Sequence, residues 1–312
     1  MLVVAGDIGG THARLAIFDG KKIVKEKKYL SKEYSSFLEL LQEFLTEKVE
    51  AGCFGIAGPI IQGTCQATNL PWIVDAADLS KKLNIPQVWL LNDLEATAWG
   101  LPFLNESQLL TLNQGKTQEG NQAVIAAGTG LGEAGLYWDG KAHHPFASQG
   151  GHVNFAPRND REKKLLNYLH KKYDHVSYER VLSGAGMEHL YWCLVEDGEK
   201  EDFEEGDIPA LITEKALKEE SQICLDVLDW FVSIYGSEAG NLALKFSALG
   251  GVYVAGGIAP KIVSILKNGS FMKAFCDKGR FQSFLSSIPV KVVLTDDVAL
   301  FGAASYAMNC LL

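Results

Sequence analysis

Cysteine is scarce and scattered in this chain. Six cysteines occur among 312 residues, with no Cys-x-x-Cys pair and no neighbouring histidine at the spacing of a zinc site. This excludes a disulfide framework and a cysteine-based metal site. We expect all six thiols to be reduced and buried: Cys53, Cys65, Cys193, Cys224, Cys276 and Cys310.

Long apolar runs and long basic runs are also missing. Asp7 interrupts the first apolar run, and no stretch reaches about 18 uninterrupted apolar residues, so neither a secretory signal nor a membrane partner is expected. The net charge of −9 and the shortness of the basic stretches argue against a nucleic-acid partner. We expect a cytoplasmic protein. Its length exceeds the usual size of one hydrophobic core, which favours two lobes.

The most informative segment present is Asp7-Ile8-Gly9-Gly10-Thr11, directly after the apolar run 2–5. The run predicts a buried strand that carries Asp7 to the carboxyl edge of a sheet, where α/β proteins bind ligands. The glycines let backbone N–H groups approach an anion, and Thr11 adds a hydroxyl donor. Since 13–18 reads as a second strand, the glycines lie in a hairpin turn. The pattern indicates a phosphate-binding loop or an ordinary hairpin turn with a surface aspartate.

The same plan of strand, glycine turn and strand occurs twice. The first copy continues with an edge strand at 22–30, a helix at 34–49 and strands at 53–58 and 88–93. The second copy has a strand at 122–127, the turn Gly128-Thr129-Gly130 and a strand at 134–138. The rest of the chain is predicted to contain helices at 160–173, 178–195, 221–249 and 298–312. Strands are predicted at 251–257 and 290–294. The repetition predicts two similar α/β lobes, 1–103 with 296–312 and 104–295, with a cleft between their glycine turns.

Two segments match the sequence patterns of nucleotide-binding motifs, but the residues that follow them do not fit the structure that each motif requires. The segment 130–135 fits G-x-G-x-x-G, but a strand at 136–138 and the hairpin turn Asp139-Gly140 follow it, where the dinucleotide fingerprint needs a helix. The segment 135–141 has the spacing of a P-loop, but Ala142 stands where a magnesium-binding Ser or Thr is required. Neither motif is taken as functional.

The glycine turns in their order resemble those of the sugar-kinase and actin-like ATPase superfamily, with Gly256-Gly257-Ile258 as a turn on the adenosine side. Leu91-Asn92-Asp93, 150–157 and 179–184 are similar to signature segments of the bacterial ATP-dependent glucokinase family. The likeness covers nearly the whole chain, and the cysteine-rich zinc motif of the related ROK sugar kinases is absent from it. The resemblance implies two ribonuclease-H-like lobes with a mixed sheet each and an interlobe cleft, phosphorylation of glucose by ATP with Mg²⁺, and a homodimer.

The resemblance also assigns residues to the sugar. Asp93 suits the general base for the 6-hydroxyl, although Asn92 and Asp93 can equally cap a helix that begins at Leu94. Taken alone, His152 reads as a core histidine and Glu179 as a helix-surface charge. The implied sugar ligands are Asn69, Asn92, Asp93, Gln149, His152 and Glu179; Asn69 can also be a turn residue before Pro71.

Two positions depart from the family pattern. Gln149 stands where the family usually has glutamate, which keeps an acceptor oxygen and removes a charge. His12 stands where asparagine is common, and its side chain could reach phosphate or point into the lobe.

The resemblance also assigns residues to the nucleotide. This nucleotide set is Gly6, Asp7, Gly9, Gly10, Thr11, Gly128, Thr129, Gly130, Gly257 and Ile258, with Asp7 acting on Mg²⁺ through water. Arg14 reads as a structural residue that could also help to neutralise phosphate.

Two other functions remain open. Gln149 makes a kinase for another hexose or for an amino sugar plausible. A sugar sensor without turnover is the non-enzymatic alternative, but loss of catalysis should remove Asp93 or the phosphate-loop residues, and all of these are present.

Overall fold

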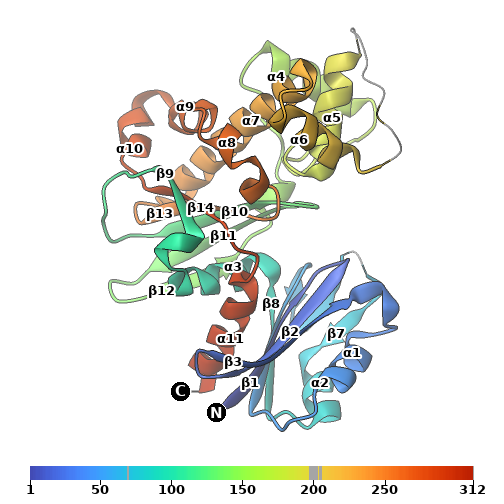
Figure 1. The fold of residues 1–312 in the computed structure, drawn as a ribbon. Coiled ribbons are helices and arrows are strands. Elements are labelled where there is room, and N and C mark those ends of the chain that lie inside the picture. The colour runs from blue at the N-terminus through green and yellow to red at the C-terminus, as the bar shows by residue number, and fades with distance from the viewer. Residues whose placement is uncertain (69, 197–202, 204–205, 312) are drawn as a thin grey trace. The chain divides into compact units, whose positions relative to one another are not determined.

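The computed structural model describes residues 1–68, 70–196, 203 and 206–311. The chain forms two compact units (Figure 1). Unit 1 comprises Met1–Asn105 and Thr295–Leu312, and unit 2 comprises Glu106–Leu294. Across the described ranges, no helix is both long enough and apolar enough to cross a membrane.

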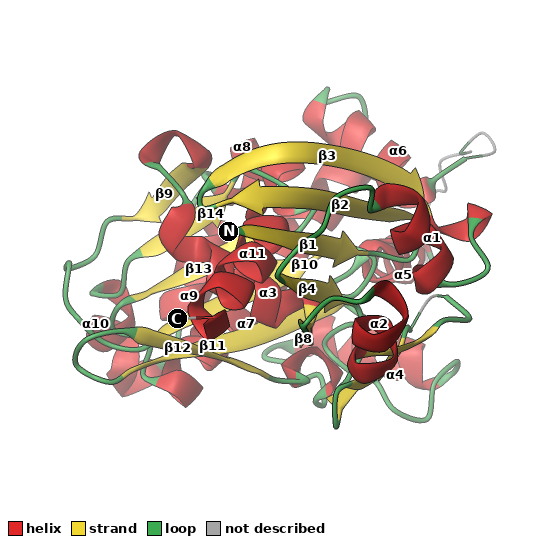
Figure 2. Ribbon diagram, turned by 90° about the horizontal axis from the view of Figure 1, so that it is seen from below, coloured by secondary structure: helices red, strands yellow, loops and turns green. Residues whose placement is uncertain are grey.

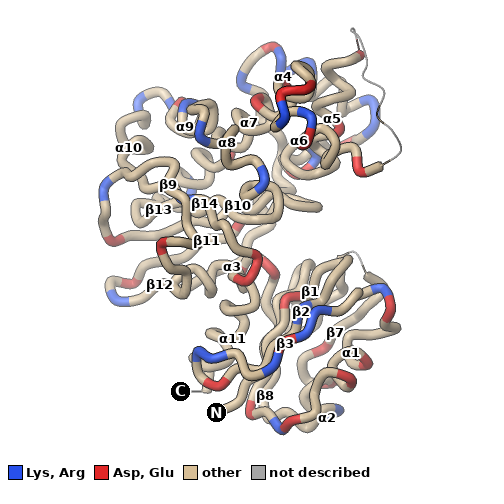
Figure 3. The backbone as a smooth tube through the Cα atoms, in the orientation of Figure 1, with Lys and Arg blue, Asp and Glu red and all other residues tan. Residues whose placement is uncertain are grey.

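Unit 1 is built on a five-stranded mixed sheet in the order β3-β2-β1-β4-β8 (Figure 2). The first three strands form an antiparallel meander, as predicted, and β4 and β8 extend it in parallel. The strands are β1 Leu2–Ile8, β2 His12–Asp19, β3 Lys22–Leu30, β4 Ala51–Ile56 and β8 Gln87–Asn92. The edge strand β3 carries the lysines that are coloured blue in Figure 3, and charge on an edge discourages pairing with other chains.

Alternating residues of the unit 1 strands build two cores. Val4, Ile8 and Leu15 pack on one face with α1 Phe37–Phe44 and α2 Ala76–Leu83. Val3 and Ala5 pack on the other face with α3 Asp93–Gly100 and α11 Val298–Leu311. A small separate sheet consists of β5 Ile60–Ile61, β6 Thr64–Gln66 and β7 Ile73–Asp75.

The first predicted helix is shorter than the predicted range 34–49. Ser36 caps α1 by accepting from the backbone N–H of Glu39, which starts the helix at Phe37. At the other end the Lys25 ammonium donates to the carbonyl of Phe44 over 2.6 Å, which satisfies a terminal acceptor and ends the helix.

Unit 2 repeats the plan in a six-stranded sheet ordered β12-β11-β10-β13-β14-β9. Again three strands form an antiparallel meander and two continue in parallel, so the predicted repetition is confirmed. The strands are β9 Leu109–Asn113, β10 Gln122–Ala127, β11 Leu131–Trp138, β12 His143–Ala147, β13 Gly251–Ala255 and β14 Val290–Val293.

The long helix α7 Gln222–Phe246 runs through the core of unit 2, close to the predicted 221–249. The predicted helix 178–195 is wrong in its first turns. The segment 178–183 forms turns, and α5 begins at Gly184 because Ser183 caps it by accepting from the N–H of Gly186. The remaining helices are α4 Asp160–His170, α5 Gly184–Val195, α6 Ile208–Leu217, α8 Val263–Leu266, α9 Ser270–Cys276 and α10 Gln282–Ser286. Short 3₁₀ helices occupy Ser31–Glu33, Leu101–Phe103, Glu106–Gln108, Gly150–His152, Ala259–Ile262 and Gly279–Phe281.

All six cysteines are reduced, as expected, but two are not buried. Cys276 is half-buried and Cys310 is exposed. Both stand in the last turn of a helix, α9 and α11, where one side faces away from the core.

The contact between α3 and α11 depends on two glycines. A Cβ atom at Gly302 would lie 1.7 Å from the carbonyl oxygen of Ala96, and one at Gly100 would lie 1.9 Å from that of Val298. These are backbone atoms, so neither clash can be relieved by a side-chain rotation.

We therefore predict that Gly302→Ala lowers the free energy of unfolding by roughly 1–3 kcal/mol, the usual range for overpacking. Denaturation in urea measures the loss. Gly184→Ala is the matched control, because a helical Cβ there meets nothing nearer than 3.8 Å. Equal midpoints for Gly302→Ala and wild type would contradict the close contact.

Candidate functional site

Asp7 and Asp93 lie at the carboxyl edge of the unit 1 sheet. Pairing in parallel register aligns Ile8 with Ile56 and Ile56 with Asn92, so β1, β4 and β8 end together. Asp93 is the first residue of α3. Strand pairing thus gathers carboxylates from distant parts of the sequence at one edge, where α/β sheets bind ligands.

Asn92 and Asp93 do cap α3. The backbone N–H of Leu94 donates to Oδ1 of Asn92 and to Oδ1 of Asp93, both at 3.0 Å. The Asn92 amide donates to the carbonyl oxygen of Gly58 over 3.2 Å. The capping alternative is therefore confirmed as a contact, and it fixes both side chains without using all of their acceptor capacity.

Burial raises the pKa of both carboxyls, and repulsion from Asp93 adds to the shift of Asp7. Burial raises the pKa of Asp93 to about 6, against the opposing effect of the Leu94 N–H. Burial, followed by repulsion from Asp93, raises the pKa of Asp7 to about 7, while Arg14 opposes the shift and Asp296 adds to it. Such shifts are typical of groups that accept protons or bind cations.

The first glycine turn is the predicted hairpin between β1 and β2. The N–H of Gly9 donates to the carbonyl of His12 over 2.9 Å, and the Ser31 hydroxyl donates to the carbonyl of Gly9 over 2.9 Å. The His12 side chain is exposed, so of its two predicted orientations the one into the lobe is wrong.

Two neighbouring residues have structural contacts. The Arg14 guanidinium pairs with Glu26 and with Asp297, which agrees with its structural reading. A Cβ at Gly6 would lie 2.7 Å from Leu15 and 2.9 Å from Phe54, so this glycine provides room for core packing. Its place in the nucleotide set stays a prediction.

The carboxylates of unit 1 suit a magnesium ion only in part. Within the described portion of the chain, no three His, Cys, Asp or Glu side chains are grouped to hold a metal. Mg²⁺ is commonly held by one or two carboxylates, with water and substrate phosphates completing its shell. Asp7, whose pKa is raised by burial and then by repulsion from Asp93, fits that kind of site.

Three backbone segments of unit 2 meet at the second glycine turn. The N–H of Gly128 donates to the carbonyl of Gly130, and the N–H of Gly184 donates to the carbonyl of Gly128, both at 2.9 Å. A Cβ at Gly128 would lie 3.9 Å from the nitrogen of Gly257. The structure thus joins the two predicted turns and adds the N-terminus of α5, which favours anions.

Sequence reasoning missed the contribution of α5 because it placed the start of the helix too early. The usable signal was Ser183, a good N-cap residue, before Gly184-Ala185-Gly186. The rejection of the two misleading motifs is confirmed, since β11 follows the turn directly and pairs with β12 around Asp139-Gly140.

His152 and Glu179 lie together in unit 2. Nδ1 of His152 is 3.7 Å from Oε1 of Glu179, and Oε2 of Glu179 accepts from the N–H of Leu131 over 3.0 Å. Both residues line a pocket of about 410 Å³. His152 is exposed rather than a core histidine, and Glu179 lies before α5 rather than on a helix surface.

Other residues of this pocket were not predicted. They are Lys172, Tyr173, Asp174, His175, Ser177 and Arg180. Gln149 is exposed and directly precedes the turn Gly150–His152, with its carbonyl accepting from the N–H of His152 over 3.0 Å. Asn69 lies outside the described residues.

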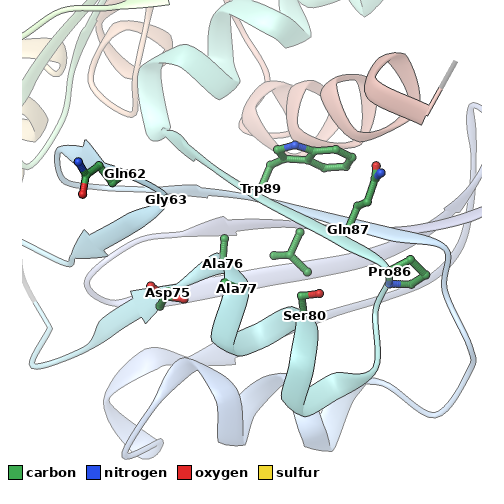
Figure 4. Close-up of a pocket in the computed structure, with 10 residues that line it drawn as sticks. Gln62, Gly63, Asp75, Ala76, Ala77, Ser80, Pro86, Gln87 and Trp89 are labelled. Carbon is green, nitrogen blue, oxygen red and sulfur yellow. The ribbon is translucent and has the colours of Figure 1, made fainter.

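A second hollow, of about 440 Å³, lies in unit 1 between β8 and α2 (Figure 4). Trp89, Pro86 and Ser80 contribute to its lining. It contains no residue that the sequence assigned to a substrate, so the two described constellations are the candidate sites.

Comparison with known proteins identifies the family. The profile of the family described as Glucokinase matches residues 4–310. A glucokinase of Nostoc punctiforme is 39% identical, over 97% of this chain and 98% of its own. The chain belongs to the glucokinase family.

Solved structures support the same fold. A crystal structure of glucokinase from an Antarctic psychrotroph has a TM-score of 0.87 at 32% identity and covers 99% of both chains. A ROK family glucokinase from Streptomyces griseus, in complex with glucose and AMPPNP, has a TM-score of 0.68 over 99% of this chain and 100% of its own, and at 19% identity it shows the fold alone. The predicted α/β class, with a mixed sheet in each lobe, is confirmed.

The raised pKa of Asp7 predicts the pH dependence of stability. Between about pH 4 and pH 7 the folded protein retains a proton that the unfolded chain has released, so stability falls as pH rises through this window. Asp7→Asn removes the effect and should stabilise the metal-free protein by roughly 1–4 kcal/mol at pH 8. Urea denaturation in EDTA measures it.

Asp75→Asn is the control, because the contribution of Asp75 to stability should depend on pH in the opposite direction. The N–H of Asp78 and the hydroxyl of Thr64 lower the pKa of Asp75, so its stabilisation is lost as pH falls. If Asp7→Asn and wild type lose stability in parallel from pH 4 to pH 8, Asp7 does not retain a proton in the folded protein.

Proposed function

We propose that this chain transfers the terminal phosphoryl group of ATP to the 6-hydroxyl of glucose. The observation that carries the proposal is membership of the glucokinase family over residues 4–310. The ROK protein of Streptomyces griseus, which has the same fold, was crystallised with glucose and a nucleotide analogue. This supports a fold able to hold both kinds of substrate.

In this proposal Asp93 is the general base. A base needs an acceptor oxygen within reach of the hydroxyl and a pKa near the working pH, and burial raises the pKa of Asp93 to about 6. The N–H of Leu94 orients one carboxylate oxygen at 3.0 Å. Asn92 beside it can donate to one sugar hydroxyl and accept from another.

The remaining sugar hydroxyls are assigned to unit 2 and to Asn69. His152 and Glu179 line one pocket, and a carboxylate with an imidazole can satisfy several hydroxyls at once. Gln149 offers an amide in the same segment as His152. The homodimer that the family resemblance implies stays a prediction.

Phosphate binding is assigned to the glycine turns. Gly9, Gly10 and Thr11 in unit 1, and Gly128, Thr129 and Gly130 with Gly257 and Ile258 in unit 2, offer backbone N–H groups and hydroxyls. Bound Mg²⁺, held by Asp7 through water, would neutralise charge on the transferred phosphoryl group. The structural Gly128–Gly184 contact brings the N-terminus of α5 to the same loop.

A second candidate, phosphorylation of another hexose or an amino sugar, is favoured by one observation. Gln149 is exposed in the segment of His152 and carries no charge, whereas a glutamate there would accept stronger hydrogen bonds. An amide offers both a donor and an acceptor, whereas a carboxylate only accepts, so Gln149 can pair with a different pattern of sugar hydroxyls.

A coupled assay with ATP, Mg²⁺ and a panel of sugars decides between these candidates. We expect the highest kcat/KM with glucose, and we expect Gln149→Glu to lower the KM for glucose by about fivefold, because a charged hydrogen bond contributes about 1 kcal/mol more than a neutral one. A higher kcat/KM for glucosamine or mannose selects the second candidate. Tight sugar binding with no turnover selects the sensor.

The role of Asp93 is tested by Asp93→Asn. We expect kcat to fall by about 10²–10⁴-fold, since a positioned base contributes that much, while glucose binding measured by calorimetry is retained. Glu95→Gln is the matched control in the same helix, two residues on, and should keep near-normal activity. Near-normal turnover of Asp93→Asn removes Asp93 from the role of base.

A further inference from the structure

Glu133 is a buried carboxyl group that the proposed reaction does not use. It stands on β11 with 1% of its surface exposed. Its Oε1 atom has no hydrogen-bond partner among the described residues. A buried carboxylate without a cation or donors is unfavourable, so the group needs a specific neutralising arrangement.

The neighbouring group is a second buried carboxyl, that of Glu238 on α7, which is 0% exposed. Oε2 of Glu238 accepts from the Asn241 amide over 2.7 Å, and Oε1 pairs with the Lys245 ammonium at 3.1 Å. One lysine can balance only one carboxylate. The pair therefore reaches neutrality when Glu133 keeps its proton.

The surroundings of Glu133 agree with that state. Burial, followed by repulsion from Glu238, raises the pKa of Glu133 to about 8, and Lys245 only partly opposes this. The titratable and charged groups that face the pair are Lys245 and Tyr235 of α7, Tyr178 of the segment before α5, and Lys278 after α9.

Both segments that carry the pocket residues His152 and Glu179 rest on this pair. A Cβ at Gly150 would lie 1.9 Å from Oε2 of Glu133, and the Ser148 hydroxyl donates to the backbone carbonyl of Glu133 over 2.9 Å. On the other side, the Asn241 amide that binds Glu238 also donates to the Tyr178 hydroxyl over 3.2 Å.

The two segments are also joined to each other. The N–H of Glu179 donates to the carbonyl of Gly151 over 2.9 Å, and the N–H of Tyr178 donates to that of Val153 over 3.1 Å. The buried pair is thus connected to His152 and Glu179 by the side chains of Ser148, Tyr178 and Asn241 together with these backbone hydrogen bonds.

We propose that Glu133 and Glu238 share one proton and act as a positioning pair, holding the segments 148–152 and 177–179 in the arrangement that binds the sugar. This rests on the proposed function of His152 and Glu179 as sugar ligands. Loss of the shared proton places two negative charges beneath Gly150 and Tyr178, and the segments separate from β11 and α7. Sugar affinity falls while the chemistry at Asp93 is unchanged.

The first test is the pH dependence of stability, which does not need activity. Between about pH 4.5 and pH 8 the folded protein keeps the proton on Glu133 and the unfolded chain has released it, so the urea midpoint of wild type falls across this window. Glu133→Gln carries no such proton, and its midpoint should fall less steeply. Parallel slopes overturn the shared proton.

The second test is the KM for glucose between pH 7 and pH 9.5. In wild type we expect KM to rise above about pH 8, by as much as about tenfold for one pH unit, with kcat unchanged. Glu133→Gln should keep KM constant over this range, and Glu133→Ala, which removes the support under Gly150, should raise KM at every pH. Equal KM profiles for wild type and Glu133→Gln overturn the positioning role.

Glu188→Gln is the matched control in unit 2. Glu188 accepts from the Trp192 indole N–H over 3.1 Å, a bond that an amide oxygen can keep, so this variant should follow wild type in both tests. Absence of both turnover and sugar binding at every pH overturns the proposed function and the positioning role together. The pH dependence of the urea midpoint tests the shared proton independently of turnover and sugar binding.

Discussion

The hydrogen-bond register of β1, β4 and β8 is the constraint from which the chemistry of unit 1 follows. Parallel pairing requires the three strands to end at one edge, and α3 must then leave that edge at once. Gly55 makes this possible, because a Cβ there would lie 2.8 Å from that of Ala96. Asp7 and Asp93 are crowded and desolvated as a result of this packing, and their raised pKa values are a property of the sheet as much as of the residues.

Local signals were sufficient for the framework of the fold. The apolar runs before Asp7 and Gly128, each followed by a glycine turn and another strand, predicted the meander of unit 1 and the β10–β11 hairpin of unit 2, and the long apolar pattern of α7 was unambiguous. Short elements were not predictable in the same way. The strands β5–β7 have two or three residues and show no period. The start of α3 was indicated by its capping residues, but α3 packs against both α11 and β4 and shows no clear apolar period. The start of α5 was misplaced because tertiary backbone bonds from Tyr178 and Glu179 override the helical pattern of the sequence.

In the candidate sites, too, some features followed from local sequence signals and others did not. The hairpin at Gly9 followed from turn chemistry, whereas the proximity of His152 to Glu179 was reached only through resemblance to a family, since no local rule links these positions. The association of Glu133 with Glu238 had no sequence signal. In the sequence Glu133 is one polar residue in a strand and Glu238 one in a helix, and only the packing of α7 against the sheet makes Glu238 the main source of charge repulsion on Glu133.

Unit 1 is assembled from both ends of the chain, and this affects how it can fold. The face of its sheet that contains Val3, Ala5 and Phe18 is covered by α11, the last helix, while unit 2 is one continuous segment. A ribosome delivers these strands long before it delivers their cover. Unit 2 can therefore close its core first, and the apolar face of the earlier strands must remain uncovered, or be shielded by a chaperone, until α11 has been synthesised.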